Sequence, residues 1–248
     1  MVGDNRRLTS SSFPCNMMND TDRLVTMELV KVLLSLSFAE ALRPWLQLRD
    51  LMRVVTGNSS VELQGPPQII DDRDKKQRVV LEFRAITLEQ EGVGSINDNV
   101  SYVVDFVTKV HGASSLPRIS KTRTDALFIE SYALPFHELL ALVKERYLQL
   151  SPLVDSATDV GLIMDQHEGR IVKHIQIGPM EREQLQSMFL RWPRQKLPER
   201  FLFLALGYEQ DGEGEFAPDC FREFLQTAVK WQIQQAETNV RYLSGEER

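Results

Sequence analysis

The feature that most constrains the fold is an order of strand-like and helix-like segments that occurs twice along the chain. Each time, a segment of alternating apolar residues is followed by one with apolar residues at helical spacing and then by two further alternating segments. These segments are 27–37, 38–57, 79–90 and 99–110 in the first unit, and 124–134, 135–150, 157–166 and 170–178 in the second. The sequence therefore predicts two β-α-β-β units and suggests an internal duplication.

A short sequence similarity among the predicted helices supports this organisation. The pattern Phe-x-Glu-x-Leu occurs at 38–42, at 136–140 and at 221–225, each time shortly after a predicted strand. Phe and Leu one turn apart can dock a first helical turn on a sheet, and a Glu there complements the positive helix end. Because any helix start can acquire this chemistry independently, the similarity is weak support for common descent.

The C-terminal part completes the predicted architecture. A helix at 179–191, a strand at 200–210 and a helix from 218 form an α-β-α segment after the second unit. We therefore expect an α+β fold in which a mostly antiparallel, curved sheet carries its helices on one face. The predicted organisation is a poorly ordered extension at 1–22, a first unit at 23–123, and the second unit with the C-terminal segment at 124–248.

Composition excludes several classes of protein. The formal net charge is −6, which argues against a protein that coats nucleic acid through its overall charge. No stretch reaches the ~18 apolar residues of a membrane span. The chain has only two cysteines, so we expect neither a disulfide framework nor a zinc quartet, and we expect a cytoplasmic location. Nothing in the sequence points to a metal ion or a cofactor.

The richest cluster of chemically active residues lies in the predicted hairpin at 157–178. Strand alternation places Asp165, His167 and His174 on one polar face, where Asp165 could orient a histidine as a base. A turn at Glu168 and Gly169 would leave the two histidines about 13 Å apart, too far to share one metal ion. A solvated hairpin face is the simpler interpretation, and these three residues are weak catalytic candidates.

Two predicted loops are locally basic and are candidates for binding a partner. The first, 111–123, carries Arg118, Lys121 and Arg123; the second, 191–200, carries Arg191, Trp192, Arg194 and Lys196. Arg and Trp often anchor interfaces, and an acidic loop at 209–215 could receive the second loop within the chain or across a homodimer.

Three functions remain open on the sequence alone. The leading hypothesis is a non-enzymatic binding or regulatory module for a protein partner or a small ligand, because no catalytic motif is present. A hydrolase or nuclease that uses Asp165, His167 and His174 is one alternative. A nucleic-acid accessory protein that contacts phosphate through the basic loops is the other, and is less favoured.

Overall fold

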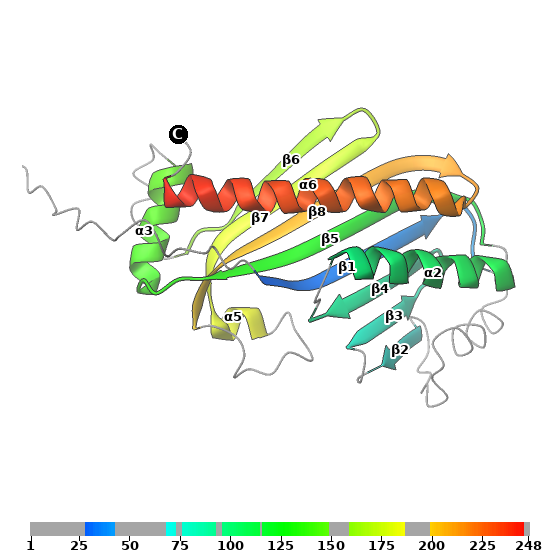
Figure 1. The fold of residues 1–248 in the computed structure, drawn as a ribbon, viewed down its shortest axis with the longest axis horizontal. Helices are drawn as coiled ribbons and strands as arrows, with labels where there is room; N and C mark the ends of the chain where they lie inside the picture. The colour runs from blue at the N-terminus through cyan, green and yellow to red at the C-terminus, as the bar shows by residue number, and fades with distance from the viewer. Residues whose placement is uncertain are drawn as a thin grey trace, which may run out of the picture.

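The computed structural model describes residues 28–42, 68–72, 76–92, 96–114, 116–148, 159–186 and 199–245. Within these ranges the protein is α+β, with eight strands in one open sheet and four helices (Figure 1). All strand pairs are antiparallel. The predicted fold class and the antiparallel sheet are thus confirmed, whereas the predicted extension at 1–22 lies outside the described residues.

The strands follow an order in the sheet that differs from their order in the chain. They are β1 (Glu28–Phe38), β2 (Gln68–Asp72), β3 (Gln77–Leu81), β4 (Ala85–Glu91), β5 (Ile119–Ser131), β6 (Leu162–Glu168), β7 (Ile171–Glu181) and β8 (Arg200–Gly214). Across the sheet the order is β2-β3-β4-β1-β5-β8-β7-β6. β1 and β5 are therefore central neighbours, β4 and β8 flank them, and β2 and β6 form the edges.

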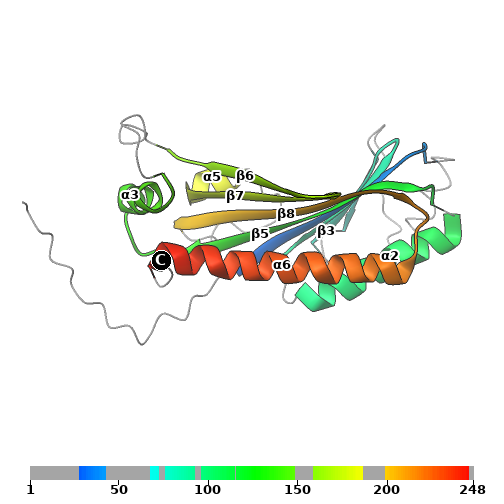
Figure 2. The same cartoon turned by 90° about the horizontal axis from the view of Figure 1, so that it is seen from above.

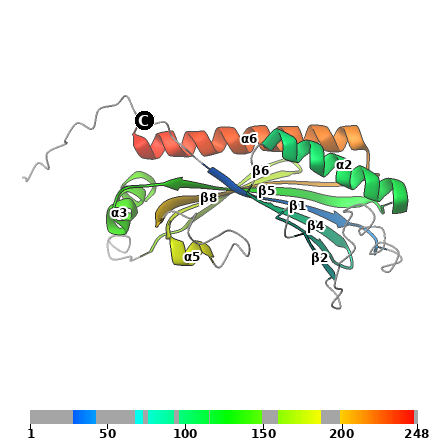
Figure 3. The same ribbon diagram turned by 60° about the horizontal axis from the view of Figure 1, so that its bottom comes forward.

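The helices are distributed over both sides of the sheet. They are α2 (Ile96–Ser114), α3 (Phe136–Tyr147), α5 (Arg182–Gln186) and α6 (Pro218–Ser244). The two long helices, α2 and α6, lie on one face, while α5 lies on the opposite side and α3 lies at one end of the sheet (Figures 2 and 3). The expectation that helices occupy one face therefore holds for α2 and α6 and is wrong for α5.

Most of the apolar core lies between the sheet and the two long helices. One cluster combines β1, β3 and β4 with α2 and the first turns of α6, and a second combines β5, β7 and β8 with α3 and the last turns of α6. A smaller cluster, on the other face of the sheet, contains Val30, Leu127, Ile129, Phe201 and Phe203. The sheet therefore buries apolar side chains on both faces over part of its length.

The largest error of the sequence prediction concerns the segment 99–110. It is predicted as a strand, but it lies inside α2. Its valines suggested a strand because β-branched residues favour extended backbone. The buried residues Val100, Val103, Val104, Val107 and Val110 nevertheless follow helical spacing. Burial of this stripe against the sheet and α6 outweighs the local preference for a strand.

Several predicted boundaries are also wrong. Phe38 belongs to β1, residues 39–42 are not helical, and the rest of the helix predicted at 38–57 lies outside the described residues. The strand predicted at 79–90 is the hairpin of β3 and β4, and β2 was not predicted. β7 extends through Pro179 to Glu181, so the helix predicted from 179 begins only with α5.

Two predicted loops are largely regular structure. The segment 111–123 contains the end of α2 and the start of β5, and the acidic segment 209–215 lies in β8 up to Gly214. Because residues 119–123 of β5 pair with residues 209–214 of β8, the charged residues of the two segments meet across a sheet and not in flexible loops. No helix among the described ranges is long and apolar enough to cross a membrane.

A polar row on the open sheet face

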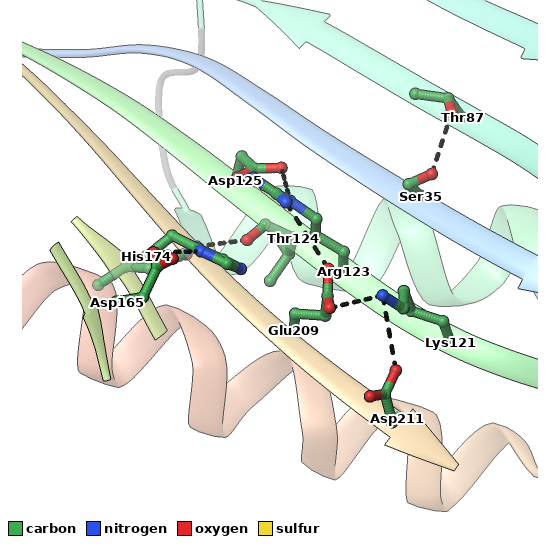
Figure 4. Close-up of polar contacts among 11 residues, drawn as sticks. Ser35, Thr87, Lys121, Arg123, Thr124, Asp125, Asp165, His174, Glu209 and Asp211 are labelled. Atoms are coloured by element: carbon green, nitrogen blue, oxygen red, sulfur yellow. Dashed lines mark hydrogen bonds and ion pairs between the residues drawn. The ribbon is translucent and has the colours of Figure 1, made fainter. Parts of the chain in front are cut away.

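The candidate site is a row of charged side chains on the sheet face that lies opposite α2 and α6, here called the open face. On β5, Ala126 packs into the core beneath α6, and Gln232 of α6 donates a hydrogen bond to the carbonyl of Thr124. Strand alternation therefore turns the odd-numbered residues of β5 towards the open face. The ionic row, as we define it, consists of Lys121, Arg123, Asp125, Asp165, His174, Glu209 and Asp211 (Figure 4).

One end of the ionic row is a carboxylate–imidazole pair. Asp165 of β6 lies directly opposite His174 of β7, and its Oδ1 is 2.7 Å from the imidazole Nδ1. The side chain of Asp165 is about half exposed, whereas that of His174 is 25% exposed. The other ring nitrogen, Nε2, is buried and has no hydrogen-bond partner. The pair thus has the geometry of an oriented imidazole, with Nδ1 bonded to Asp165 and Nε2 unpartnered.

A glycine lets this pair meet the rest of the row. Gly207 of β8 lies opposite both His174 and Asp125, so it separates β7 from β5 at this level. A Cβ placed on Gly207 would lie 2.6 Å from Oδ1 of Asp125 and 3.1 Å from Cβ of His174. Both contacts are shorter than van der Waals distance. The absence of a side chain at Gly207 therefore allows Asp125 and His174 to converge over the strand.

Alternating charges continue along β5 and β8. Arg123 holds Asp125 through two donors, with Nε 2.8 Å from Oδ2 and Nη2 2.8 Å from Oδ1. Lys121 Nζ is 2.7 Å from Oε1 of Glu209 and 3.6 Å from Oδ1 of Asp211. The hydrogen bond to Glu209 raises the pKa of Lys121, and the bond to Asp125 raises the pKa of Arg123. The cations of the row are therefore held charged by adjacent carboxylates.

The hairpin candidates from the sequence are only partly brought together. The predicted parity is correct, but the turn is formed by Gly169 and Arg170, one residue later than predicted. This shift places Asp165 directly opposite His174. His167 lies opposite Val172 and is exposed. The two histidines are thus diagonal neighbours across β6 and β7 and not the distant pair that was predicted.

The basic candidates have different environments. Lys121 and Arg123 belong to the ionic row, so their positive charges are matched by carboxylates. Arg118 is exposed just before β5, and its carbonyl accepts a hydrogen bond from the amide of Ala39. Arg191, Trp192, Arg194 and Lys196 lie outside the described residues. The described residues of the two predicted basic loops therefore do not form a surface of net positive charge.

Asp125, Glu209 and Asp211 are members of the ionic row that the sequence did not indicate as candidate site residues. Asp125 and Gly207 fall in predicted strands without a role, and Glu209 and Asp211 fall in the predicted acidic loop. The detectable signal was the alternation of charged residues at 121, 123 and 125 and at 209 and 211. Alternation shows that such residues share a face, but it does not show which other strand lies beside them.

The chemistry open to this site is limited. Over the described ranges, no group of three or more His, Cys, Asp or Glu side chains is arranged to hold a metal ion. No hydroxyl or thiol group is hydrogen-bonded to Nε2 of His174, as nucleophilic catalysis by a triad would require. What the row offers is a set of fixed charges, with partly exposed carboxylates at its two ends. No protein-family model matches the chain, and no curated protein matches its sequence.

Proposed function

We propose that the protein is a non-enzymatic binding module that holds a positively charged segment of a protein partner on its open face. The observation that carries this proposal is the charge pattern of the ionic row. Its central cations, Arg123 and Lys121, are already paired, whereas Asp165 and Asp211 at the ends have side chains 47% and 58% exposed. Carboxylates with remaining exposure favour Lys and Arg side chains of a partner over phosphate groups.

The wider open face supports the same charge preference. Leu33 of β1 pairs with Glu89 of β4 and with Asp125 of β5, so the side chain of Glu89 points to the open face as that of Asp125 does. Lys31 Nζ lies 3.1 Å from the carboxylate of Glu89. Ser35 of β1 lies opposite Thr87 of β4 and Arg123 of β5, and the Ser35 and Thr87 hydroxyl oxygens are 3.2 Å apart. The face therefore offers paired cations, partly exposed carboxylates and hydroxyl groups, which suits a polar, basic partner better than an apolar small ligand.

The test uses a fluorescent Lys/Arg-rich peptide and a Glu-rich peptide of equal length as probes. We expect the basic peptide to bind with an affinity that falls as salt rises. Asp165→Asn and Asp211→Asn should each weaken binding about two- to fivefold, the size of an exposed ion pair. Asp219→Asn on α6 is the matched control and should have no effect. Equal binding of both peptides, or equal weakening by all three substitutions, would refute the proposal.

A hydrolase is the second candidate, because Asp165 is bonded to Nδ1 of His174 in the geometry that orients a catalytic base, and it requires the ring to move so that the buried Nε2 reaches water. In this function, His174 would act as a general base on a water molecule. Hydrolysis of nitrophenyl esters and of a nitrophenyl phosphodiester is the assay. His174→Gln should abolish turnover, and His167→Gln is the matched control that should retain it. Turnover that survives His174→Gln would exclude this function.

We also propose that the chain consists of two duplicated units, and that the elements of each unit differ from the predicted β-α-β-β order. The first half contains β1 to β4 and ends with α2, and the second contains β5 to β8 and ends with α6. Corresponding strands occupy corresponding places on either side of the β1–β5 boundary. The junction then falls at 115–118, not at 123–124. Separate expression of 28–114 and 116–245 tests this division: a folded second half by circular dichroism supports it, and two unfolded halves would contradict it.

A further inference from the structure

The outer edge of β6 is the most exposed strand edge on which side chains are described. β6 ends the sheet order, and within the described ranges no other strand pairs with its outer side (Figure 1). All six residues from 163 to 168 are exposed, among them Ile163 at 74% and Met164 at 41%. An edge strand with exposed apolar side chains on both faces is a template for pairing with another strand.

The hydrogen-bonding pattern shows which backbone groups of β6 face outward. The amide of Asp211 in β8 donates to the carbonyl of Arg170. Bonding directions alternate along a strand, so Ile171 turns its backbone groups towards β6 and pairs with Glu168. On β6, residues 164, 166 and 168 therefore bond to β7. The amide and carbonyl groups of Ile163, Asp165 and His167 point away from the sheet.

Only a few registers allow two such edges to pair across a two-fold axis. Outward-pointing residues must face one another, which limits the central pairs to Asp165 with Asp165, Asp165 with Ile163, or Asp165 with His167. The first register places two carboxylates directly opposite each other, which is unfavourable. The second places each Asp165 opposite an apolar Ile163, and only the third places the imidazole of His167 beside Asp165 of the second copy, twice by symmetry. Charge complementarity therefore selects the third register, in which Gln166 faces its own copy.

We propose that the protein forms a homodimer in which β6 pairs antiparallel with β6 of a second copy in this register. The paired edges would join two eight-stranded sheets and two open faces into one continuous surface. Because the shared ribbon is short, its buried area falls below the ~1,000 Å² typical of stable interfaces, so the dimer is weak and depends on concentration. This inference does not depend on the partner proposed for the open face.

Disulfide cross-linking tests the register directly. In a background with Cys15→Ser and Cys220→Ser, Gln166→Cys places two thiols in a pair whose Cα atoms are about 4.5 Å apart, which a disulfide can span. Met164→Cys and Glu168→Cys are matched controls: each alone should cross-link slowly, but their mixture should form heterodimers. The fastest homodimer formation at residue 166 supports the register. Equal rates at all three positions, or a maximum at another position, would overturn it.

Sedimentation velocity tests the dimer itself without covalent bonds. The wild-type protein should shift from monomer to dimer across roughly a hundredfold range of concentration. His167→Pro removes an outward amide donor without touching the bonds to β7, and should raise the dimer Kd about tenfold or more. His167→Asn keeps the donor and should retain the dimer. A wild-type monomer at every concentration, or unchanged association of a folded His167→Pro variant, would refute the proposal.

Discussion

Replacing Gly207 with alanine is the most direct test of how the ionic row is assembled. The added Cβ would lie 2.6 Å from Oδ1 of Asp125, 3.1 Å from Cβ of His174 and 3.2 Å from Cδ2 of His174. Asp125 cannot simply rotate away, because two bonds from Arg123 hold its carboxylate. We therefore expect Gly207→Ala to lower the free energy of unfolding by about 1–3 kcal/mol, the usual cost of overpacking a filled site.

The control lies in the same strand. Gly212 of β8 has no atom within 4 Å of an added Cβ. Gly212→Ala should therefore be neutral or stabilise the protein by about 0.4–1 kcal/mol, because alanine restricts the unfolded chain. Urea unfolding followed by circular dichroism measures both variants. The Gly207→Ala cost should also shrink when Asp125 is replaced by alanine, because the shortest of the three contacts is then removed.

Two outcomes would refute this reasoning. If Gly207→Ala and Gly212→Ala have the same free energy of unfolding, the close approach over Gly207 is not a constraint on the fold. If the penalty of Gly207→Ala is unchanged in the Asp125→Ala background, the cost does not arise from Asp125. Either result would mean that the convergence of His174 and Asp125 does not depend on a residue without a side chain.

Two further predictions concern buried polar groups. Burial raises the pKa of Tyr147, so the stability it contributes is present below about pH 10 and is lost as the pH rises above that value; alkaline unfolding of Tyr147→Phe should show a weaker loss. Gln232 donates bonds to the carbonyls of Thr124 and Leu206 at 3.0 and 2.8 Å. Urea unfolding should show a cost of about 1–3 kcal/mol for Gln232→Leu and almost none for the exposed control Gln234→Leu; equal costs would contradict this.

Local periodicity correctly predicted the elements whose apolar pattern and intrinsic preference agree. The stripe with Leu139, Leu140 and Val143 is the buried face of α3, and Leu225 and Ala236 are buried in α6. The segment in α2 is different, because valines that prefer extended backbone occupy helical spacing. Where preference and spacing disagree, the outcome depends on which surfaces are available for burial, and the sequence does not show those surfaces.

The candidate site also has a part that local sequence predicts and a part that it does not. Alternation along the hairpin correctly places Asp165 and His174 on one face, since parity is a local property of each strand. The register of that hairpin required the turn at Gly169 and Arg170 to be known. Contact with Asp125 depends further on the pairing of β8 with both β5 and β7, which joins segments distant in the chain.

The sequence by itself therefore determined an α+β chain, the antiparallel character of its strands, and which charged residues share a face within each strand. These properties follow from the period of apolar residues and from local turn chemistry. The tertiary structure alone decided that Asp165, His174, Asp125, Arg123 and Glu209 form one row, and that the charges of Lys121 and Arg123 are matched by carboxylates within it. The physical reason is that pairing between distant strands is selected by burial of the whole sheet, which no single segment encodes.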